Sequence, residues 1–99
     1  MDTEQKMRQI YDQISEIAGE FGVEKIVLFG SRARKAHHPK SDIDIAVYGC
    51  KHFFEFRDRV EEEVWTLLRF DMIDMSQNYI SRELEEEIKK DGVIIYEKI

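Results

Sequence analysis

Acidic and apolar side chains alternate at the start of residues 42–48, DIDIAVY. Successive side chains of a β-strand point to opposite faces of its sheet. The alternation therefore predicts a strand with Asp42 and Asp44 on one face, about 6–7 Å apart along the backbone. Ile43 and Ile45 lie on the other face, where their burial would fix the register of the strand. The chain is therefore expected to form a sheet with one buried apolar face and one face that carries acidic side chains.

The two acids on that face need a physical reason, because acidic residues are depleted in strands. Two like charges held side by side repel each other unless a cation lies between them. Mg²⁺ is the natural candidate, since it takes hard oxygen ligands and leaves room for water and phosphate oxygens. A solvated strand face or the start of a turn is the alternative explanation of Asp42 and Asp44.

A glycine–serine pair precedes the acids by ten residues. Residues 24–29, EKIVLF, predict a strand that ends at Gly30, and Ser31 is suited to cap a short helix over 31–36. Free backbone N–H groups at a helix start bind anions, so Gly30 and Ser31 are candidates for holding phosphates. Taken alone, the pair is a weak signal and is better explained by a glycine that ends a strand and a serine that caps a helix.

Helical and strand patterns alternate along the rest of the chain, with no repeat, linker or low-complexity segment to divide it. The predicted helices cover residues 3–21, 31–36, 53–68 and 81–90, and the predicted strands cover 24–29, 42–48, 70–75 and 93–96. This order predicts an α/β (α+β) fold, a small mixed sheet with helices packed on it. At this length we expect a single domain over residues 1–99.

A third carboxylate would complete a site for phosphoryl transfer, where two metal ions clamp the attacking and leaving oxygens. The candidates are Asp71 and Asp74, in the predicted strand FDMIDM. They are three residues apart, so on a strand they face opposite ways and one of them reaches the cleft. We favour Asp71 as metal ligand or general base and assign Asp74 to a solvated turn.

Basic residues cluster between the two motifs, in a chain of net charge −6. They could position a nucleotide triphosphate, with Arg32 the residue assigned to nucleotide binding, or they could form a solvated loop face. The members of this cluster are Arg32, Arg34, Lys35 and Lys40. His37 and His38 are adjacent and lack further Cys or His partners, so we do not predict a zinc site.

The aromatic residues of the predicted helix 53–68 are expected to lie in the core, including the single tryptophan, Trp65. Phe53, Phe54 and Phe56 fall within four helical positions and cannot all point inward. One of these phenylalanines is therefore expected to be available for contact with a partner.

Net charge and cysteine content restrict the possible functions. A net charge of −6 makes DNA binding unlikely, because it leaves no large basic footprint. Cys50 is the only cysteine, which excludes an internal disulfide and favours a reducing compartment. No apolar run approaches the length of a membrane span. We therefore expect a cytoplasmic protein without a membrane partner.

The stretch VLFGSRARKAHHPKSDIDIAV resembles the signature of the DNA polymerase beta-like nucleotidyltransferases: Gly-Ser, ten residues, then Asp-x-Asp. At this length the chain is most similar to the minimal nucleotidyltransferase (MNT) family, which includes the antitoxins of HEPN/MNT toxin–antitoxin pairs. Residues 71–74 and 92–96 are comparable with two later strands of that family. The resemblance covers nearly the whole chain, and its specific part is Gly30-Ser31 with the acid pair.

The resemblance implies an enzyme that transfers a nucleoside monophosphate, AMP from ATP or a unit of another nucleoside triphosphate, to a hydroxyl group. It implies that Gly30 and Ser31 bind the phosphates, that Asp42 and Asp44 ligate two Mg²⁺ ions, and that Asp71 is the third acid. The expected partner is a HEPN-domain toxin, modified on a tyrosine.

Two other functions remain open at this point. The chain could neutralise a partner by occlusion without catalysis, as a binding protein. It could also modify a small molecule, in the manner of aminoglycoside-modifying enzymes, although no second lobe is present to form a pocket for one.

Overall fold

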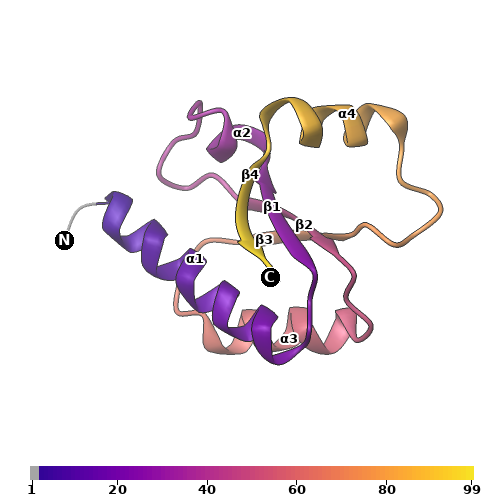
Figure 1. Cartoon of the computed structure of the whole chain (residues 1–99). Helices are drawn as coiled ribbons and strands as arrows, with labels where there is room; N and C mark the ends of the chain where they lie inside the picture. Colours follow the sequence, from indigo (N-terminus) through magenta and orange to yellow (C-terminus); the bar gives the residue numbers. More distant parts are fainter. Residues whose placement is uncertain (1–2) are drawn as a thin grey trace.

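A four-stranded sheet of order β3-β2-β1-β4 runs through the computed structural model, which describes residues 3–99 (Figure 1). The elements are α1 (Thr3–Glu20), β1 (Lys25–Phe29), α2 (Gly30–Ala33), β2 (Ile43–Tyr48), α3 (Phe53–Glu63), β3 (Phe70–Asp74), α4 (Arg82–Asp91) and β4 (Val93–Glu97). β1 is antiparallel to β2 and to β4, whereas β2 and β3 are parallel. This is the predicted small mixed sheet of the α+β class. Met1 and Asp2 of the single domain predicted over 1–99 lie outside the described residues.

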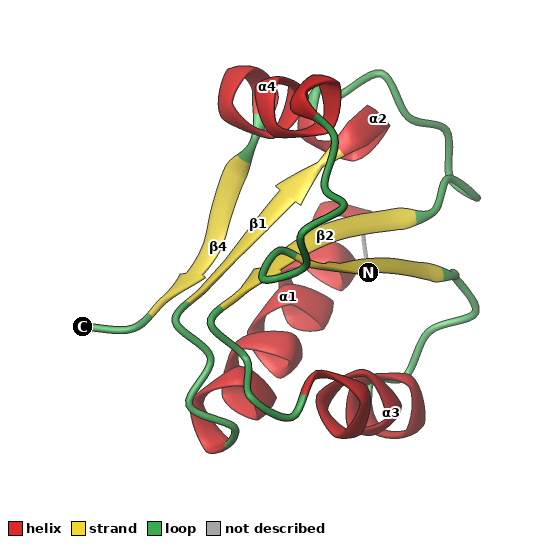
Figure 2. Ribbon diagram, turned by 90° about the vertical axis from the view of Figure 1, so that its right-hand side faces the viewer, coloured by secondary structure: helices red, strands yellow, loops and turns green. Residues whose placement is uncertain are grey.

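Helices α1 and α3 cover one face of the sheet, as Figure 2 shows. The apolar positions of α1 recur at helical spacing and pack on the inward side chains of the strands. On β2 these are Ile43, Ile45 and Val47, all completely buried. Their burial fixes the register predicted from the alternation. The fully buried Phe56 of α3 meets Phe21, which follows α1, edge to face, so the two helices are joined over the sheet.

The opposite face is covered by α4 and the short α2 (Figure 2). Its buried cluster is small and consists of Val27, Phe29, Ala46 and Ile88. Gly92 ends α4 where a Cβ would overlap both the Ile88 carbonyl oxygen and the Val27 side chain, so the glycine lets α4 close against β1. This smaller cover leaves part of the second face open.

The helix predicted over 53–68 ends at Glu63, and the burial expected for Trp65 is wrong. Val64 takes extended dihedral angles, and the Thr66 hydroxyl then accepts a hydrogen bond from the Leu68 N–H, which turns the chain toward β3. Trp65 is 95% exposed and Leu67 is fully exposed. The apolar periodicity continues past Glu63 in the sequence, but the helix does not.

The three phenylalanines of α3 divide as expected, because two of them are buried and one is not. Phe53 and Phe56 lie in the core, and Phe54 is 66% exposed. Phe54 contacts Phe53 edge to face and lies against the guanidinium of Arg57. The outward side of α3 therefore carries an aromatic surface beside a cation.

Ser31 does not cap a helix, contrary to the prediction for residues 31–36. Helix α2 begins one residue earlier, at Gly30, and Phe29 is its N-cap residue without a side-chain cap. Gly30 makes the turn out of β1 with φ 74°, so the helix starts at the glycine itself. It ends by Arg34, and Lys35 takes the left-handed conformation with φ 58°.

Within residues 3–99, none of the helices combines the length and the apolar character needed to cross a membrane.

Candidate active site

The register of the sheet brings the glycine turn and two of the predicted acids together. Asp44 of β2 is paired with Phe29 at the end of β1, directly before Gly30. On its other side Asp44 is paired with Asp71 of β3. Paired residues on neighbouring strands share a face of the sheet, so Asp44 and Asp71 lie side by side on the face that α4 covers incompletely.

Gly30 is needed at this point for two independent reasons. Its φ of 74° lies in the region that favours glycine. A Cβ at this position would also overlap the Oδ2 atom of Asp44. The glycine therefore gives the Asp44 carboxyl group its space.

The surroundings of Asp44 oppose the negative charge of its carboxylate. Burial, as the largest cause, and the negative charges of Asp71, Asp42 and Glu87 together raise its pKa to about 6. A hydrogen bond between the carboxyl groups of Asp44 and Asp71 acts in the same sense. Carboxylates that disfavour one another's charge in this way are the groups that a cation would stabilise.

Asp42 lies at the outer rim of this group. It precedes the first residue of β2, so the strand predicted to begin at Asp42 begins at Ile43, and the Asp42 side chain is exposed. Its charge still acts on Asp44. Asp71 is exposed as well, so two of the three predicted acids are accessible from solvent.

The acids fit a magnesium site of the open kind. Within the described residues, no group of three or more Asp, Glu, His or Cys side chains is arranged so that it could hold a metal ion. Mg²⁺ does not require one, because it is commonly held by one or two carboxylates and completed by water and substrate phosphates. The adjacent pair Asp44 and Asp71, with Asp42 beside it, is a donor set of that type.

Arg32 holds the loop that leads into the acids. It is 5% exposed, and its guanidinium donates from Nε to the Ser41 carbonyl oxygen (3.0 Å) and from an Nη to that of Pro39 (3.3 Å). These contacts position the residues just before Asp42. Nucleotide binding by Arg32 stays a prediction. The same holds for phosphate binding by Ser31, which is half-buried in α2.

Arg34 brings a positive charge to the rim of the site. Its guanidinium lies 3.7 Å from the carboxylate of Glu87 on α4, and both side chains are about half exposed. Glu87 also acts electrostatically on Asp44. No sequence signal could have placed Glu87 here, because its position depends on how α4 packs over the sheet.

Asp74 has a structural role, in agreement with its assignment from the sequence. Its Oδ1 accepts hydrogen bonds from the N–H and hydroxyl of Ser76, and its Oδ2 accepts one from Gln77. Burial opposes ionisation of Asp74, but these hydrogen bonds outweigh it and lower the pKa. Asp74 is paired with Val47, on the α1 and α3 face, so it points away from Asp44 and Asp71.

Comparison with known proteins places this geometry in a wider context. The family model described as "Polymerase beta, Nucleotidyltransferase" matches residues 5–99. A search of curated protein sequences finds no match.

Solved structures share the fold. The structure of a toxin–antitoxin with AMP-PNP superposes with a TM-score of 0.67 at 21% identity, over 89% of this chain and 73% of that chain. A mutant of the toxin–antitoxin MntA–HpeT gives 0.66 at 19% identity, over the same shares of 89% and 73%. A protein of Sulfolobus solfataricus, described as a candidate nucleotidyltransferase, gives 0.58 at 25% identity, over 96% of this chain and 86% of that chain.

Proposed function

The chain belongs to the polymerase beta nucleotidyltransferase family, and from that membership we propose that it transfers AMP from ATP to a hydroxyl group of a partner protein. The observation that supports this most directly is the position of Asp44. It lies between the Gly30 turn and Asp71, with a pKa raised to about 6 by burial and by neighbouring acids. Such a cluster favours a cation and its phosphate ligands over an empty, fully ionised state.

In the proposed reaction the acceptor oxygen attacks the α-phosphorus of ATP. A bond forms between that oxygen and the phosphorus, the bond from phosphorus to the bridging oxygen of the β-phosphate breaks, and pyrophosphate leaves. The acceptor proton passes to the carboxylate of Asp71, which is exposed and can approach an incoming hydroxyl group. On this proposal the backbone N–H groups of Gly30 and Ser31 hold the phosphates at the start of α2.

Two cationic elements would complete the site. Arg34, already at the rim, would exchange Glu87 for the polyphosphate, since a guanidinium binds phosphate oxygens with paired hydrogen bonds. Two Mg²⁺ ions, held by Asp42, Asp44 and Asp71, would offset the phosphate charge and polarise the reacting oxygens. Base preference would be set elsewhere, so another nucleoside triphosphate could replace ATP.

We further propose that the acceptor protein is a toxin and that this chain is its antitoxin. The fold is shared with solved toxin–antitoxin structures, and the sequence resembles the antitoxins that accompany HEPN-domain toxins. A tyrosine hydroxyl of such a toxin would be the acceptor. On this proposal the chain provides the nucleotide site and the partner provides the acceptor.

Occlusion without catalysis is the second candidate function, because large apolar side chains are exposed outside the site. Trp65, Leu67 and Phe54 are all exposed, and aromatic residues of this kind often carry much of the binding energy of an interface. On this alternative, Asp42→Asn would leave neutralisation of the partner intact.

The decisive experiment incubates the purified chain with Mg²⁺ and α-³²P-labelled ATP, with and without the product of the adjacent gene. Label on that protein, lost in Asp44→Asn and retained in the matched control Asp12→Asn on the exposed side of α1, would support AMP transfer. A stable complex without label would favour occlusion.

A further inference from the structure

One edge of the sheet is open along β3. Strand β3 is paired with β2 on one side and ends the sheet on the other. The Ile43 N–H donates to the Arg69 carbonyl oxygen and the Met75 N–H donates to that of Val47. Backbone groups alternate along a strand, so residues with odd numbers face β2, and Met72 directs its N–H and C=O away from the sheet.

The outward backbone groups of β3 have few partners within the described part of the chain. The Asp74 carbonyl oxygen accepts from Gln77 N–H (3.3 Å), and no other backbone hydrogen bond outside the regular elements ends on β3 at Phe70, Met72 or Asp74. An unpaired row of this kind is a template for one more strand.

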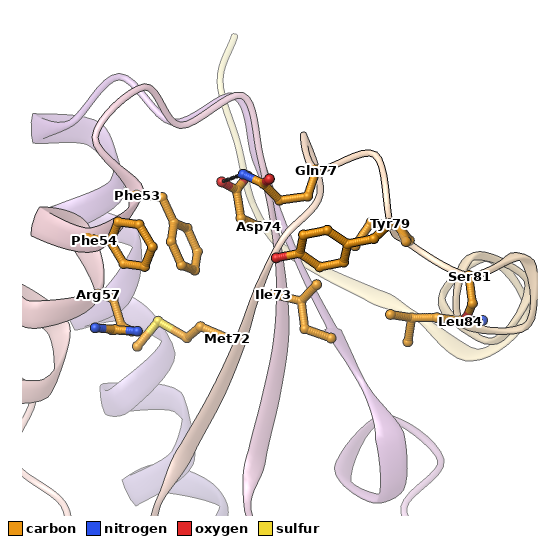
Figure 3. A pocket seen from close by; sticks show the side chains of 11 residues that line it. Phe53, Phe54, Arg57, Met72, Ile73, Asp74, Gln77, Tyr79, Ser81 and Leu84 are labelled. Carbon is orange, nitrogen blue, oxygen red and sulfur yellow. Dashed lines mark hydrogen bonds between the residues drawn. The ribbon is translucent and has the colours of Figure 1, made fainter.

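A groove of about 410 Å³ follows this edge. Figure 3 shows its two walls, with Phe54 and Arg57 of α3 on one side and Tyr79 and Leu84 on the other, and Met72 and Ile73 of β3 between them. Because the walls flank a strand, the groove suits an extended chain whose side chains alternate between them.

The described residues that line the groove include one cation, Arg57, whose guanidinium lies 3.7 Å from the carboxylate of Asp58, outside the groove, and still keeps a donor without a partner. Among the described residues, the Nε of Arg57 is buried without a hydrogen-bond partner, and its guanidinium lies over the ring of Phe54, 5.1 Å from the centroid. Among the residues that line the groove, the acid is Asp74, which already accepts hydrogen bonds from Ser76 and Gln77. A ligand here would therefore gain from an acidic side chain facing Arg57.

Strand addition at this edge would deliver a side chain to the candidate active site. Residues paired across neighbouring strands have Cβ atoms about 4.5–5.5 Å apart on the same face. A residue opposite Asp71 would thus lie beside Asp71 on the face that also carries Asp44. The next residue would face Met72 and Arg57, and the one after it Ile73 and Leu84.

We propose that an extended segment of the acceptor protein binds as an added strand on the free edge of β3. Its hydroxyl-bearing acceptor residue lies opposite Asp71, an acidic neighbour faces Arg57, and an apolar residue packs on Ile73 and Leu84. The proposal rests on the proposed function, because it identifies the substrate class as a flexible segment of protein and not a folded surface or a small molecule.

The test is a titration of the ¹⁵N-labelled full chain with the capped peptide Leu-Glu-Tyr-Glu-Leu, followed by NMR and amide hydrogen exchange. This peptide presents the same pattern in both strand directions. We expect the Met72 and Asp74 amides to shift and to exchange more slowly, and those of Asp71 and Ile73, which face β2, to change less. The peptide Leu-Lys-Tyr-Lys-Leu should bind about tenfold more weakly.

A charge reversal supplies the matched variant. Arg57→Glu should invert the preference between the two peptides, whereas Arg8→Glu, the same change at an exposed position of α1, should leave it unaltered. Undisturbed Met72 and Asp74 amides at millimolar peptide, or equal binding of both peptides to the unmodified chain, would overturn the proposal.

The titration contains no nucleotide, so it separates this proposal from the reaction. Strand addition without AMP transfer to any protein would support the binding edge and count against the proposed activity. AMP transfer with an unperturbed edge would leave the activity in place and show that the acceptor docks elsewhere.

Discussion

The two faces of the sheet differ in what their side chains contribute. On the α1 and α3 face, Ile43, Ile45 and Val47 of β2 are completely buried. On the other face the same strand carries Asp44, whose pKa is raised because burial and nearby acids oppose its charge. The same strand thus carries apolar residues that stabilise the fold and, between two of them, an acidic residue that destabilises it.

The difference indicates how so short a chain can keep a strained site. Burying one aliphatic side chain contributes about 1.5–3 kcal/mol, and the first face buries many of them. The second face has a small cluster around Ile88 and leaves Asp44 half-buried and Asp71 exposed. Because successive side chains of a strand point to opposite faces, the aliphatic residues that stabilise the fold and the acidic residues of the candidate site lie on different faces of the sheet.

Among these predictions, Asp44→Asn should have the largest effect, on the rate of AMP transfer and not on the stability of the fold. Removing a charge from the cluster should lower AMP transfer by about 100- to 1,000-fold, as loss of a single group that stabilises transition-state charge commonly does. The folded state should not be destabilised, because the substitution removes a repulsion. Initial rates with labelled ATP and urea unfolding of the same preparation measure both effects. A variant that is inactive because it unfolds would contradict this account.

Ile45→Ala, one residue further along β2, should have the opposite consequence. The cavity left under α1 and α3 should lower the free energy of unfolding by about 3 kcal/mol. The rate constant of the remaining folded protein should stay close to that of the unmodified chain, since Ile45 faces away from the acids. Urea unfolding and assays below the transition region test this, and a rate loss as large as that of Asp44→Asn would remove the separation of the two faces.

The sequence predicts the first face better than the second, for a physical reason. Burial on the α1 and α3 face follows from local periodicity, so Ile43, Ile45 and the apolar positions of α1 could be assigned without knowing the fold. The approach of Glu87 to Asp44 depends on packing between α4 and the sheet, which no local pattern encodes. The loop that exposes Trp65 depends on where the chain must turn to enter β3.

The acids on the strands of the candidate site could be predicted from the sequence, but the residues that position them could not. Spacing and alternation indicated Asp44 and Asp71, and the register places them side by side. That Gly30 gives space to the Asp44 carboxyl group, and that Arg32 holds the Pro39 and Ser41 carbonyl groups, required three-dimensional contacts. A basic residue in a loop has the same sequence signature whether it binds phosphate or backbone.

Gly30→Ala should damage the open face through geometry and not through charge. The added Cβ meets the Asp44 carboxyl group at a positive φ, so we expect a loss of about 1–2 kcal/mol of stability from backbone strain and displacement. AMP transfer should fall because Asp44 moves. Gly22→Ala is the matched control: it shares a positive φ but has open space around it, so it should lose stability while keeping activity. Equal rates in both variants would argue against the steric role of Gly30.

The pH dependence of the free energy of unfolding should show how much the ionised Asp44 carboxylate destabilises the fold. Its pKa is about 6 in the folded chain against an ordinary value of 3.8, so the folded state binds this proton more tightly than the unfolded state. Stability from this group is therefore highest at low pH, falls as pH rises from about 4 to 6, and is constant above that. After allowance for solvent screening, the change is about 1–2 kcal/mol.

The difference in unfolding free energy between Asp44→Asn and the unmodified chain isolates this effect from other titrating groups. We expect the difference to favour the variant at pH 7 and to shrink toward pH 4. Added Mg²⁺ at pH 7 should stabilise the unmodified chain more than the variant. A difference that does not change with pH would mean that Asp44 is not strained by its neighbours.

The smallest effect concerns the cover of the open face. Ser81 caps α4, and its hydroxyl oxygen accepts a hydrogen bond from the Leu84 N–H at 3.1 Å. Ser81→Ala should cost about 1 kcal/mol, the usual loss of an N-cap, while Ser81→Asp should retain the cap. Amide exchange should then quicken along α4 and leave α1 unaffected, because α4 is held by the small cluster around Ile88 and α1 by the large one. If α1 and α4 lost protection equally, the two faces would unfold as one unit, and the separation between them would be one of chemistry alone.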